Sequence, residues 1–391
     1  GDVYKRQRFE GKTPEKELEK DFASIRAFEQ QLTDDGMVII KLFLKIDRKE
    51  QKKRFEKLLA SKDTAWRVSK GHLKRNHDFK EYKAINEEML RKTDADYAPW
   101  TVINATKKKE AKVAVYQAVI QAMKEAVARK ELEEKGSLEK KTEMKRETAE
   151  SILAKTDLSK SMPKEVYEER LKELQKKMEH LHGELYRRRI PVVLGFEGWD
   201  AGGKGGAIKR LTSHMDPRGY VVNPTASPSD TEKAHHYLWR FWRAMPKAGH
   251  IAIFDRTWYG RVMVERIEGY CGEDDWKRAY GEINEFEKEL ADYGTIVLKF
   301  WIHIDPETQL ERFELRQNTP EKQWKITDED WRNREKYPQY KAAIDDMFRL
   351  TSTTFAPWIV LESDDKRYAR IKALRIIVEA LEKRLGECPA S

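Results

Sequence analysis

A glycine-rich segment in the second half of the chain restricts its possible folds more than any other feature. Residues 198–205, Gly-Trp-Asp-Ala-Gly-Gly-Lys-Gly, have the Gly-x-x-x-x-Gly-Lys spacing of a Walker A loop, whose backbone N–H groups cradle phosphate oxygens. The apolar residues 191–196 predict a buried strand before the loop, and residues 207–211 predict the start of a helix after it. This arrangement indicates phosphate handling. The spacing also arises by chance, so the interpretation needs a second element.

That element is a later strand that ends in an acidic residue. Together with an acidic residue inside the loop, it predicts a metal site. A Ser or Thr hydroxyl normally follows the loop lysine and binds Mg²⁺, but Gly205 stands there, and we infer that Asp200 takes over this role. Residues 250–254 predict a buried strand that ends at Asp255, as in a Walker B motif. Asp200 and Asp255 could hold Mg²⁺ against phosphate oxygens during phosphoryl transfer. A helix-capping role is the alternative for Asp255.

The chain also contains a long internal repeat. Residues 36–56 align without a gap on residues 294–314, at an offset of 258, and the match extends to Trp100, which falls on Trp358. This indicates a duplicated domain. At the same offset, a first copy of the Walker A loop would fall before residue 1. We therefore expect a fragment of a longer protein, whose first copy lacks central strands and is catalytically degenerate.

The fold class follows from the second copy. Strand patterns at 191–197, 220–224, 250–255 and 296–304 alternate with helical patterns, which is typical of a parallel sheet with helices on both faces. We predict an α/β, P-loop kinase-like domain with a helical lid, preceded by the incomplete copy. Ligands of such sheets bind outside the carboxyl ends of the strands, where the loop and Asp255 meet.

Basic side chains complete the predicted phosphate site. Arg256 and Arg261 follow Asp255 in the sequence and are expected at the mouth of this site. A break between two later helices carries more cations, which predicts a mobile flap that excludes water and clamps phosphates. The flap residues are Arg316, Lys322, Lys325 and Arg334. A solvated helical hairpin is the alternative reading of this segment.

Three segments follow from the repeat and the composition. We assign residues 8–125 to the truncated copy, 126–185 to a helical linker rich in Lys and Glu, and 186–386 to the catalytic domain. In the truncated copy, Leu58 and Asn76 replace two of the flap arginines. We therefore expect this copy to be less well equipped for phosphate.

Composition limits the classes of function. The 391 residues are 39% hydrophobic with 11 Trp, which is enough for sizeable cores, and the net charge of +9 favours a polyanionic partner. The two cysteines, Cys271 and Cys388, lack metal-ligand spacing and fit a reducing compartment. No apolar run approaches the roughly 18 residues of a membrane span. We therefore predict a cytoplasmic protein.

The motifs at 198–206, 254–262 and 322–326 together closely resemble the polyphosphate kinase type 2 family, and the duplicated layout resembles its fused two-domain subgroup. The resemblance implies Mg²⁺-dependent transfer of a phosphoryl group from polyphosphate to AMP, catalysed by the second copy. It covers about residues 158–385. The loop reads Asp-Ala-Gly-Gly-Lys where the family usually has Asp-Ala-Ala-Gly-Lys, a mild change because the loop tolerates glycine.

The resulting site hypothesis has catalytic, phosphate-binding and metal-binding parts. The predicted catalytic residues are Asp200, Lys204, Asp255 and Arg256, and Asp200 and Asp255 also hold the metal. The predicted phosphate- or nucleotide-binding residues are Gly198, Gly202, Gly203, Gly205, Gly206, Arg261, Arg316, Lys322, Lys325 and Arg334.

The expected partners are polyphosphate and a nucleotide, AMP or ADP, without nucleic acid or membrane, and we expect a homo-oligomer. Two alternatives stay open. The first is a kinase of the same fold that uses nucleoside diphosphates (ADP or GDP). The second is a non-catalytic polyanion-binding protein, against which Asp200 and Asp255 argue, because carboxylates among phosphates are useful only with a cation.

Overall fold

The computed structural model describes residues 14–134 and 151–387. They fall into two compact units, which divide between Lys140 and Lys141 and are described separately here. Among the helices of these described ranges, none is both long and apolar enough to cross a membrane.

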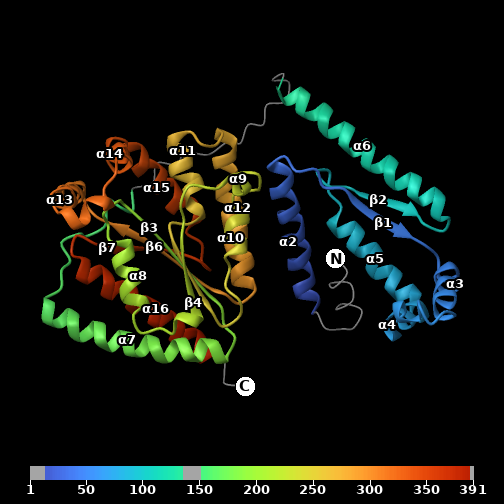
Figure 1. Cartoon of the computed structure of the whole chain (residues 1–391), viewed down its shortest axis with the longest axis horizontal. Coiled ribbons are helices and arrows are strands. Elements are labelled where there is room, and N and C mark those ends of the chain that lie inside the picture. The colour runs from blue at the N-terminus through green and yellow to red at the C-terminus, as the bar shows by residue number, and fades with distance from the viewer. Residues whose placement is uncertain (1–13, 135–150, 388–391) are drawn as a thin grey trace. The chain divides into compact units, whose positions relative to one another are not determined.

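The second unit is built on a parallel sheet, as predicted (Figure 1). Within residues 151–387 it has five strands in the order β4-β5-β3-β6-β7. Their bounds are β3 (Val192–Gly198), β4 (Tyr220–Pro224), β5 (Ile251–Asp255), β6 (Ile296–His303) and β7 (Trp358–Glu362). The strand patterns of the sequence located four of them. They missed β7, which is short and follows Pro357 directly.

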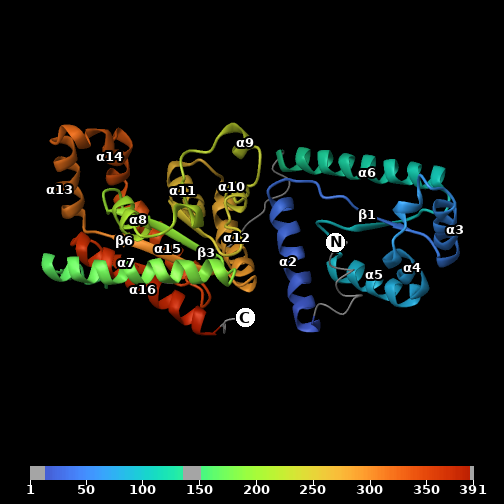
Figure 2. The ribbon, with the colours of Figure 1, turned by 60° about the horizontal axis from the view of Figure 1, so that its bottom comes forward.

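Helices cover both faces of this sheet. On one face, α7 (Lys164–Arg187) lies along α16 (Lys366–Glu387), together with α8 (Lys204–Thr212), as Figure 2 shows. Alternate side chains of β3 point to opposite faces. Leu194 packs with this first layer, whereas Val193 packs with the helices of the other face. The remaining elements are η2 (Pro217–Gly219), α9 (Asp230–Lys233), α10 (Trp239–Arg243), η3 (Trp258–Val262), α11 (Val264–Glu268), α12 (Glu273–Asp292), α13 (Pro306–Gln317), η4 (Pro320–Lys325), α14 (Asp328–Glu335) and α15 (Tyr337–Thr351).

Helix α7 falls in the predicted linker, yet its apolar stripe is part of the second unit's core. Leu174, Met178, Leu181 and Leu185 are all at most 8% exposed and pack against α8, α16 and the sheet. The 3.6-residue spacing that indicated a helix therefore also marks its buried face. The domain limits given above stay a prediction.

The first unit repeats one edge of the second. Within residues 14–134 its sheet consists of β1 (Lys41–Lys45) and β2 (Trp100–Asn104), which pair in parallel. Lys41 lies opposite Trp100, just as Lys299 lies opposite Trp358 in β6 and β7. The described residues hold no counterpart of β3, β4 or β5, as the repeat predicted. The helices are α2 (Glu15–Asp34), α3 (Arg48–Leu59), η1 (Ala65–Arg67), α4 (Lys70–His77), α5 (Phe79–Thr93) and α6 (Lys108–Glu134).

Candidate active site

The glycine-rich loop links β3 to α8 and depends on unusual backbone angles. Gly198 has φ +146°, and a Cβ there would overlap the backbone of Ile302 in the neighbouring strand β6. Gly203 has φ +116° and precedes the first residue of α8. Both positions therefore require glycine. Lys204 Nζ lies back over the loop and donates a hydrogen bond to the Gly198 carbonyl at 2.7 Å.

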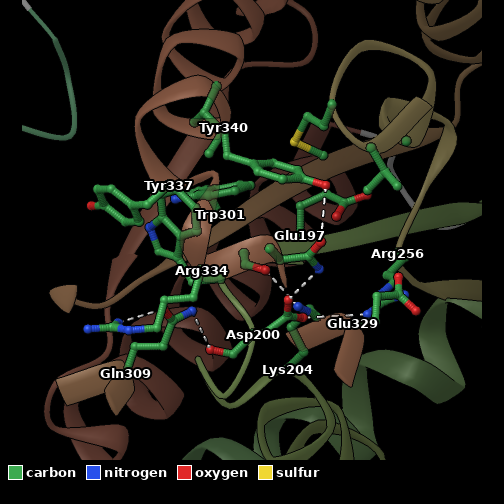
Figure 3. A pocket seen from close by; sticks show the side chains of 17 residues that line it. Glu197, Asp200, Lys204, Arg256, Trp301, Gln309, Glu329, Arg334, Tyr337 and Tyr340 are labelled. Atoms are coloured by element: carbon green, nitrogen blue, oxygen red, sulfur yellow. Dashed lines mark hydrogen bonds and ion pairs between the residues drawn. The ribbon is translucent and has the colours of Figure 1, made fainter. Parts of the chain in front are cut away.

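Asp200 sits at the centre of the pocket and is held from three sides (Figure 3). Its Oδ2 accepts a hydrogen bond from Asn333 Nδ2 at 3.1 Å, and its Oδ1 lies 3.5 Å from the Arg256 guanidinium. Its backbone carbonyl accepts from Gln309 Nε2 at 3.1 Å. The carboxylate is 18% exposed, so it is fixed in place and still reaches the cavity.

Glu197, at the end of β3, is a pocket residue that the sequence analysis missed. It is buried and accepts hydrogen bonds from the Thr257 backbone N–H at 2.6 Å and from Thr257 Oγ1 at 2.8 Å. Burial raises the pKa of this carboxyl, and Lys204 opposes that rise. The one available signal was an acid inside an otherwise apolar strand.

Arg312 of α13 fixes the loop from outside. The residue is 9% exposed, and its guanidinium donates to the carbonyls of Ala201 at 3.0 Å and Gly202 at 3.2 Å. It also donates to the carbonyls of Ser363 and Asp364 at 2.6 and 2.9 Å. One buried arginine thus ties the loop to the end of β7 and preorganises the phosphate cradle.

Residues from α13, α14 and α15 form the opposite wall of the pocket. Arg334 donates to Gln309 Oε1 at 3.0 Å and to the Pro306 carbonyl at 2.7 Å, which joins α14 to α13. Tyr337 stacks on Trp199 of the loop with ring centroids 4.5 Å apart. The pocket is therefore polar on the loop side and has an apolar wall, made of Met263, Val264, Trp301 and Ile344.

Not all predicted site residues gather in this pocket. Gly198, Asp200, Lys204, Arg256 and Arg334 line it. Asp255 ends β5 beside them. Gly202, Gly203, Gly205 and Gly206 belong to the loop and the first turn of α8. Arg261 lies elsewhere: it pairs with Glu265 at 3.1 Å and covers the Tyr237 ring at 4.4 Å.

A cationic cluster lies on the other side of the loop, and the sequence analysis found only part of it. Burial, followed by repulsion from Arg312, Arg370, Arg316 and Lys322, lowers the pKa of Lys366 to about 8. The space beside two glycines of the loop shows that Arg370 and Lys366 lie against it. A Cβ on Gly206 would lie 3.0 Å from the Arg370 guanidinium, and one on Gly203 would lie 3.9 Å from Lys366 Cγ. Crowded cations of this kind favour an anionic ligand. Lys325 instead lies over the exposed Trp324 ring at 4.9 Å.

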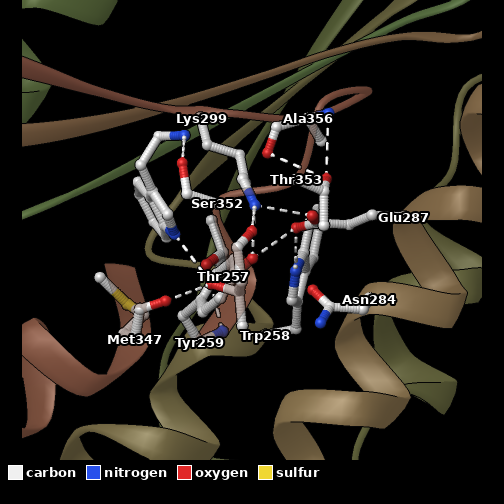
Figure 4. Close-up of polar contacts among 12 residues, drawn as sticks. Thr257, Trp258, Tyr259, Asn284, Glu287, Lys299, Met347, Ser352, Thr353 and Ala356 are labelled. Carbon is white, nitrogen blue, oxygen red and sulfur yellow. Dashed lines mark hydrogen bonds and ion pairs between the residues drawn. The ribbon is translucent and has the colours of Figure 1, made fainter. Parts of the chain in front are cut away.

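A buried ion pair supports the segment that follows Asp255 (Figure 4). Lys299 Nζ donates to Glu287 at 2.7 Å, to Tyr259 Oη at 2.7 Å and to the Thr351 carbonyl at 2.8 Å. Glu287 also accepts from Tyr259 and Trp258. Burial lowers the pKa of Lys299 and raises that of Glu287, while their mutual attraction opposes both shifts. Trp258 and Tyr259 are therefore core residues.

The acidic side chains fit a magnesium ion that is shared with substrate. No group of three or more His, Cys, Asp or Glu side chains gathers as a metal site in residues 14–134 and 151–387. Mg²⁺ at phosphate-transfer sites usually has only one or two carboxylate ligands, with phosphate oxygens and water for the rest. Asp200, which lines the pocket, and Asp255, at the end of β5, would supply two such carboxylates.

Comparisons with known proteins show which family the chain resembles. The model of the polyphosphate kinase 2 (PPK2) family matches residues 3–131 and 161–388. A polyphosphate:AMP phosphotransferase of Pseudomonas aeruginosa is 41% identical over 383 residues, which cover 96% of this chain and 75% of the relative. A polyphosphate:AMP phosphotransferase of Acinetobacter johnsonii is 38% identical, and the match covers 92% of this chain and 72% of the relative.

Solved structures show the same relationship. A structure from Pseudomonas aeruginosa has a TM-score of 0.83 and 39% identity, and the match covers 98% of this chain and 75% of that one. A polyphosphate kinase 2 from Arthrobacter aurescens has a TM-score of 0.58 and 29% identity, over 61% of this chain and 87% of its own. The chain therefore belongs to the polyphosphate kinase 2 family.

Proposed function

We propose that the second unit transfers the terminal phosphoryl group of inorganic polyphosphate to AMP, which gives ADP. The observation that carries this proposal is the meeting of Asp200, Lys204 and Arg256 at a glycine-rich loop, with a cationic cluster on the loop's other side. The relatives from Pseudomonas aeruginosa and Acinetobacter johnsonii, which match over more than nine-tenths of this chain, are named for this reaction.

The two sides of the loop suit the two substrates. The polyphosphate chain would lie along Lys366, Arg370, Arg316 and Lys322, whose mutual repulsion it would relieve. The nucleotide would occupy the pocket, with its phosphate near Asp200 and its nucleoside against the apolar wall. Donor and acceptor then meet at Lys204.

The reaction asks the protein mainly for positioning and charge stabilisation. An oxygen of the AMP phosphate attacks the terminal phosphorus of polyphosphate, the P–O bond to the next phosphate breaks, and the released chain is one unit shorter. Lys204 has three N–H donors and uses one on Gly198, so two can stabilise the transferred group. Asp200 orients or deprotonates the acceptor. We assign no covalent nucleophile.

Asp200 and Asp255 would hold Mg²⁺ near the transferred group. The ion supplies positive charge that offsets the charge on the phosphate oxygens. Asn333 and Arg256 hold the Asp200 carboxylate in place. The homo-oligomeric state that the sequence analysis expected stays a prediction, which sedimentation of the full chain would test.

The main alternative is a nucleoside diphosphate acceptor. Other relatives are named ADP- or GDP-polyphosphate phosphotransferases, at 36% and 40% identity, but they match only 58% and 48% of this chain. The test is the initial rate of phosphorylation of AMP, ADP and GDP at equal concentration with polyphosphate and Mg²⁺. We expect the fastest product to be ADP from AMP. Faster formation of ATP or GTP would overturn the choice of acceptor.

A further inference from the structure

The first unit carries almost all of the chain's excess positive charge in one segment. Residues 48–80, here called the basic hairpin, have 12 Lys and Arg against 4 Asp and Glu, a net charge of +8. The matched residues 306–338 of the second unit have 7 against 8, a net charge of −1. The whole chain has +9. Because like charges repel and oppose compaction, folding alone gives no reason for this concentration.

Several basic side chains of this hairpin lie together on one solvent-exposed face of a helix. In α3, Lys49, Lys52, Lys53 and Lys57 are spaced so that they share one face of the helix, and all four are exposed. Glu56 lies on the same face, but it is 3.8 Å from Lys52 and highly exposed, so it neutralises little of the stripe. The helix thus presents a row of ammonium groups to solvent.

The first unit also keeps the framework of the cationic cluster. Arg54, which matches Arg312, donates to the carbonyls of Ala105 and Thr106 at 2.7 and 2.9 Å. These carbonyls are the counterparts of two that Arg312 holds in the second unit. The same arginine therefore joins the same two elements, without a glycine-rich loop in residues 14–134.

The side chains around this framework are more basic than in the second unit. Lys108 and Lys112 stand at the positions of Lys366 and Arg370, and both are exposed at the start of α6. Thr106 and Lys107 replace two adjacent acids, Asp364 and Asp365. The changes at Leu58 and Asn76 remove two cations, but the segment as a whole gains far more than it loses.

We propose that the basic hairpin and the start of α6 form a second, non-catalytic binding surface for inorganic polyphosphate. This inference rests on the proposed function, in which polyphosphate is the donor. The positive charge of this surface is complementary to a long polyanion. Lys108 and Lys112 also match Lys366 and Arg370, which lie against the glycine-rich loop of the second unit. The surface retains the donor chain but transfers nothing. The earlier expectation that this copy is poorly equipped for phosphate then applies to catalysis and not to binding.

The test is direct titration of the full chain with end-labelled long-chain polyphosphate, without nucleotide, followed by fluorescence anisotropy. The test variant carries Lys49→Gln, Lys53→Gln, Lys108→Gln and Lys112→Gln. A matched control removes the same charge from exposed positions elsewhere, with Lys124→Gln, Lys130→Gln, Lys172→Gln and Lys176→Gln. We expect the test variant to bind about tenfold more weakly and the control to change by less than about twofold, because exposed charges act mainly within a Debye length.

A second readout separates this surface from the catalytic site. The test variant should raise KM for long-chain polyphosphate and leave KM for tripolyphosphate unchanged, since the catalytic site alone can hold a donor of three phosphates. Equal binding by the test and control variants would overturn the proposal. So would single-stranded DNA that competes as well as polyphosphate, because the surface would then be one for nucleic acid. A binding difference without any phosphorylation of AMP would overturn the proposed function and leave this surface standing.

Discussion

The two units share a buried polar network, but within residues 14–134 and 151–387 only the second unit has a glycine-rich loop. In the first unit Lys41 pairs with Glu29 at 2.7 Å, and in the second Lys299 pairs with Glu287 at the same distance. In each unit a tryptophan also donates to a threonine hydroxyl beside the lysine. Since the first unit keeps this network without the loop, its role is to join the sheet to its helices, and the chemistry depends on other residues.

The two networks differ in how far water is excluded. The pair of the second unit is 1% and 0% exposed, whereas Lys41 and Glu29 are 8% and 16% exposed. Two aromatic donors, Trp258 and Tyr259, complete the second network. The first unit is thus a less enclosed version of the same scaffold.

The long C-terminal helices of the two copies show the same contrast. In α16, Leu374 and Leu381 are 1% and 0% exposed and pack against α7, α8 and the sheet. Their matches in α6, Tyr116 and Met123, are 68% and 58% exposed. Equivalent apolar stripes therefore contribute very different amounts of burial.

Two substitutions of acidic residues, one in each unit, test whether catalysis belongs to the second unit alone. Asp200→Asn should lower kcat by at least about a thousandfold if Asp200 has the proposed role, because a neutral amide would hold Mg²⁺ more weakly than a carboxylate and cannot accept a proton. Asp96→Asn, a change at an exposed acid of the first unit, should leave kcat within about twofold of the original. Initial rates of ADP formation measure both. Substantial turnover by the Asp200 variant would place the chemistry elsewhere.

The second prediction compares the loss of stability when the lysine of each buried ion pair is replaced. Lys299→Met leaves Glu287 buried without its partner and should destabilise the second unit by about 3–5 kcal/mol. Lys41→Met leaves the more exposed Glu29, which water can solvate, so about 1 kcal/mol is expected in the first unit. Hydrogen exchange of β6 and β1 amides reports each unit separately. Equal losses in the two units would show that the enclosure of the pair does not matter.

A third comparison concerns the apolar stripes. Leu381→Ala should cost about 2–5 kcal/mol, because it opens a cavity in the core. Met123→Ala should stay within about 0.5 kcal/mol, because its side chain already faces solvent. Protection of the α16 and α6 amides against hydrogen exchange measures the two changes. A large loss for Met123→Ala would reveal an unrecognised packing partner for α6.

The smallest effect is a pH dependence of donor binding. The lowered pKa of Lys366, about 8, means that its ammonium is present below that pH and is lost above it. KM for tripolyphosphate should therefore rise severalfold between pH 7 and pH 9. Lys366→Arg keeps its charge over this range and should flatten the profile. An unchanged profile in this variant would remove Lys366 from the donor site.

Local patterns predicted the parts of the site that are contiguous in sequence. The loop, the strand ending at Asp255 and the helical break of the flap each have a spacing that can be read from a short window. Lys366 and Arg370 were missed, because they reach the loop only through long-range packing. Glu197 adjoins the loop in sequence and was missed because it lies inside an otherwise apolar strand. Arg261 has the right charge and position in the sequence, but its ion pair with Glu265 points it away from the pocket.

In the proposed reaction, the glycine-rich loop of the second unit transfers phosphate from polyphosphate to AMP. Phosphorus NMR of the full chain with AMP, polyphosphate and Mg²⁺ would detect this transfer, beside Lys204→Ala and a control in the same helix, Lys209→Ala. We predict ADP signals with the original chain and with Lys209→Ala, and none above background with Lys204→Ala. ADP formation that survives Lys204→Ala, or no ADP from a folded original chain, would contradict the account.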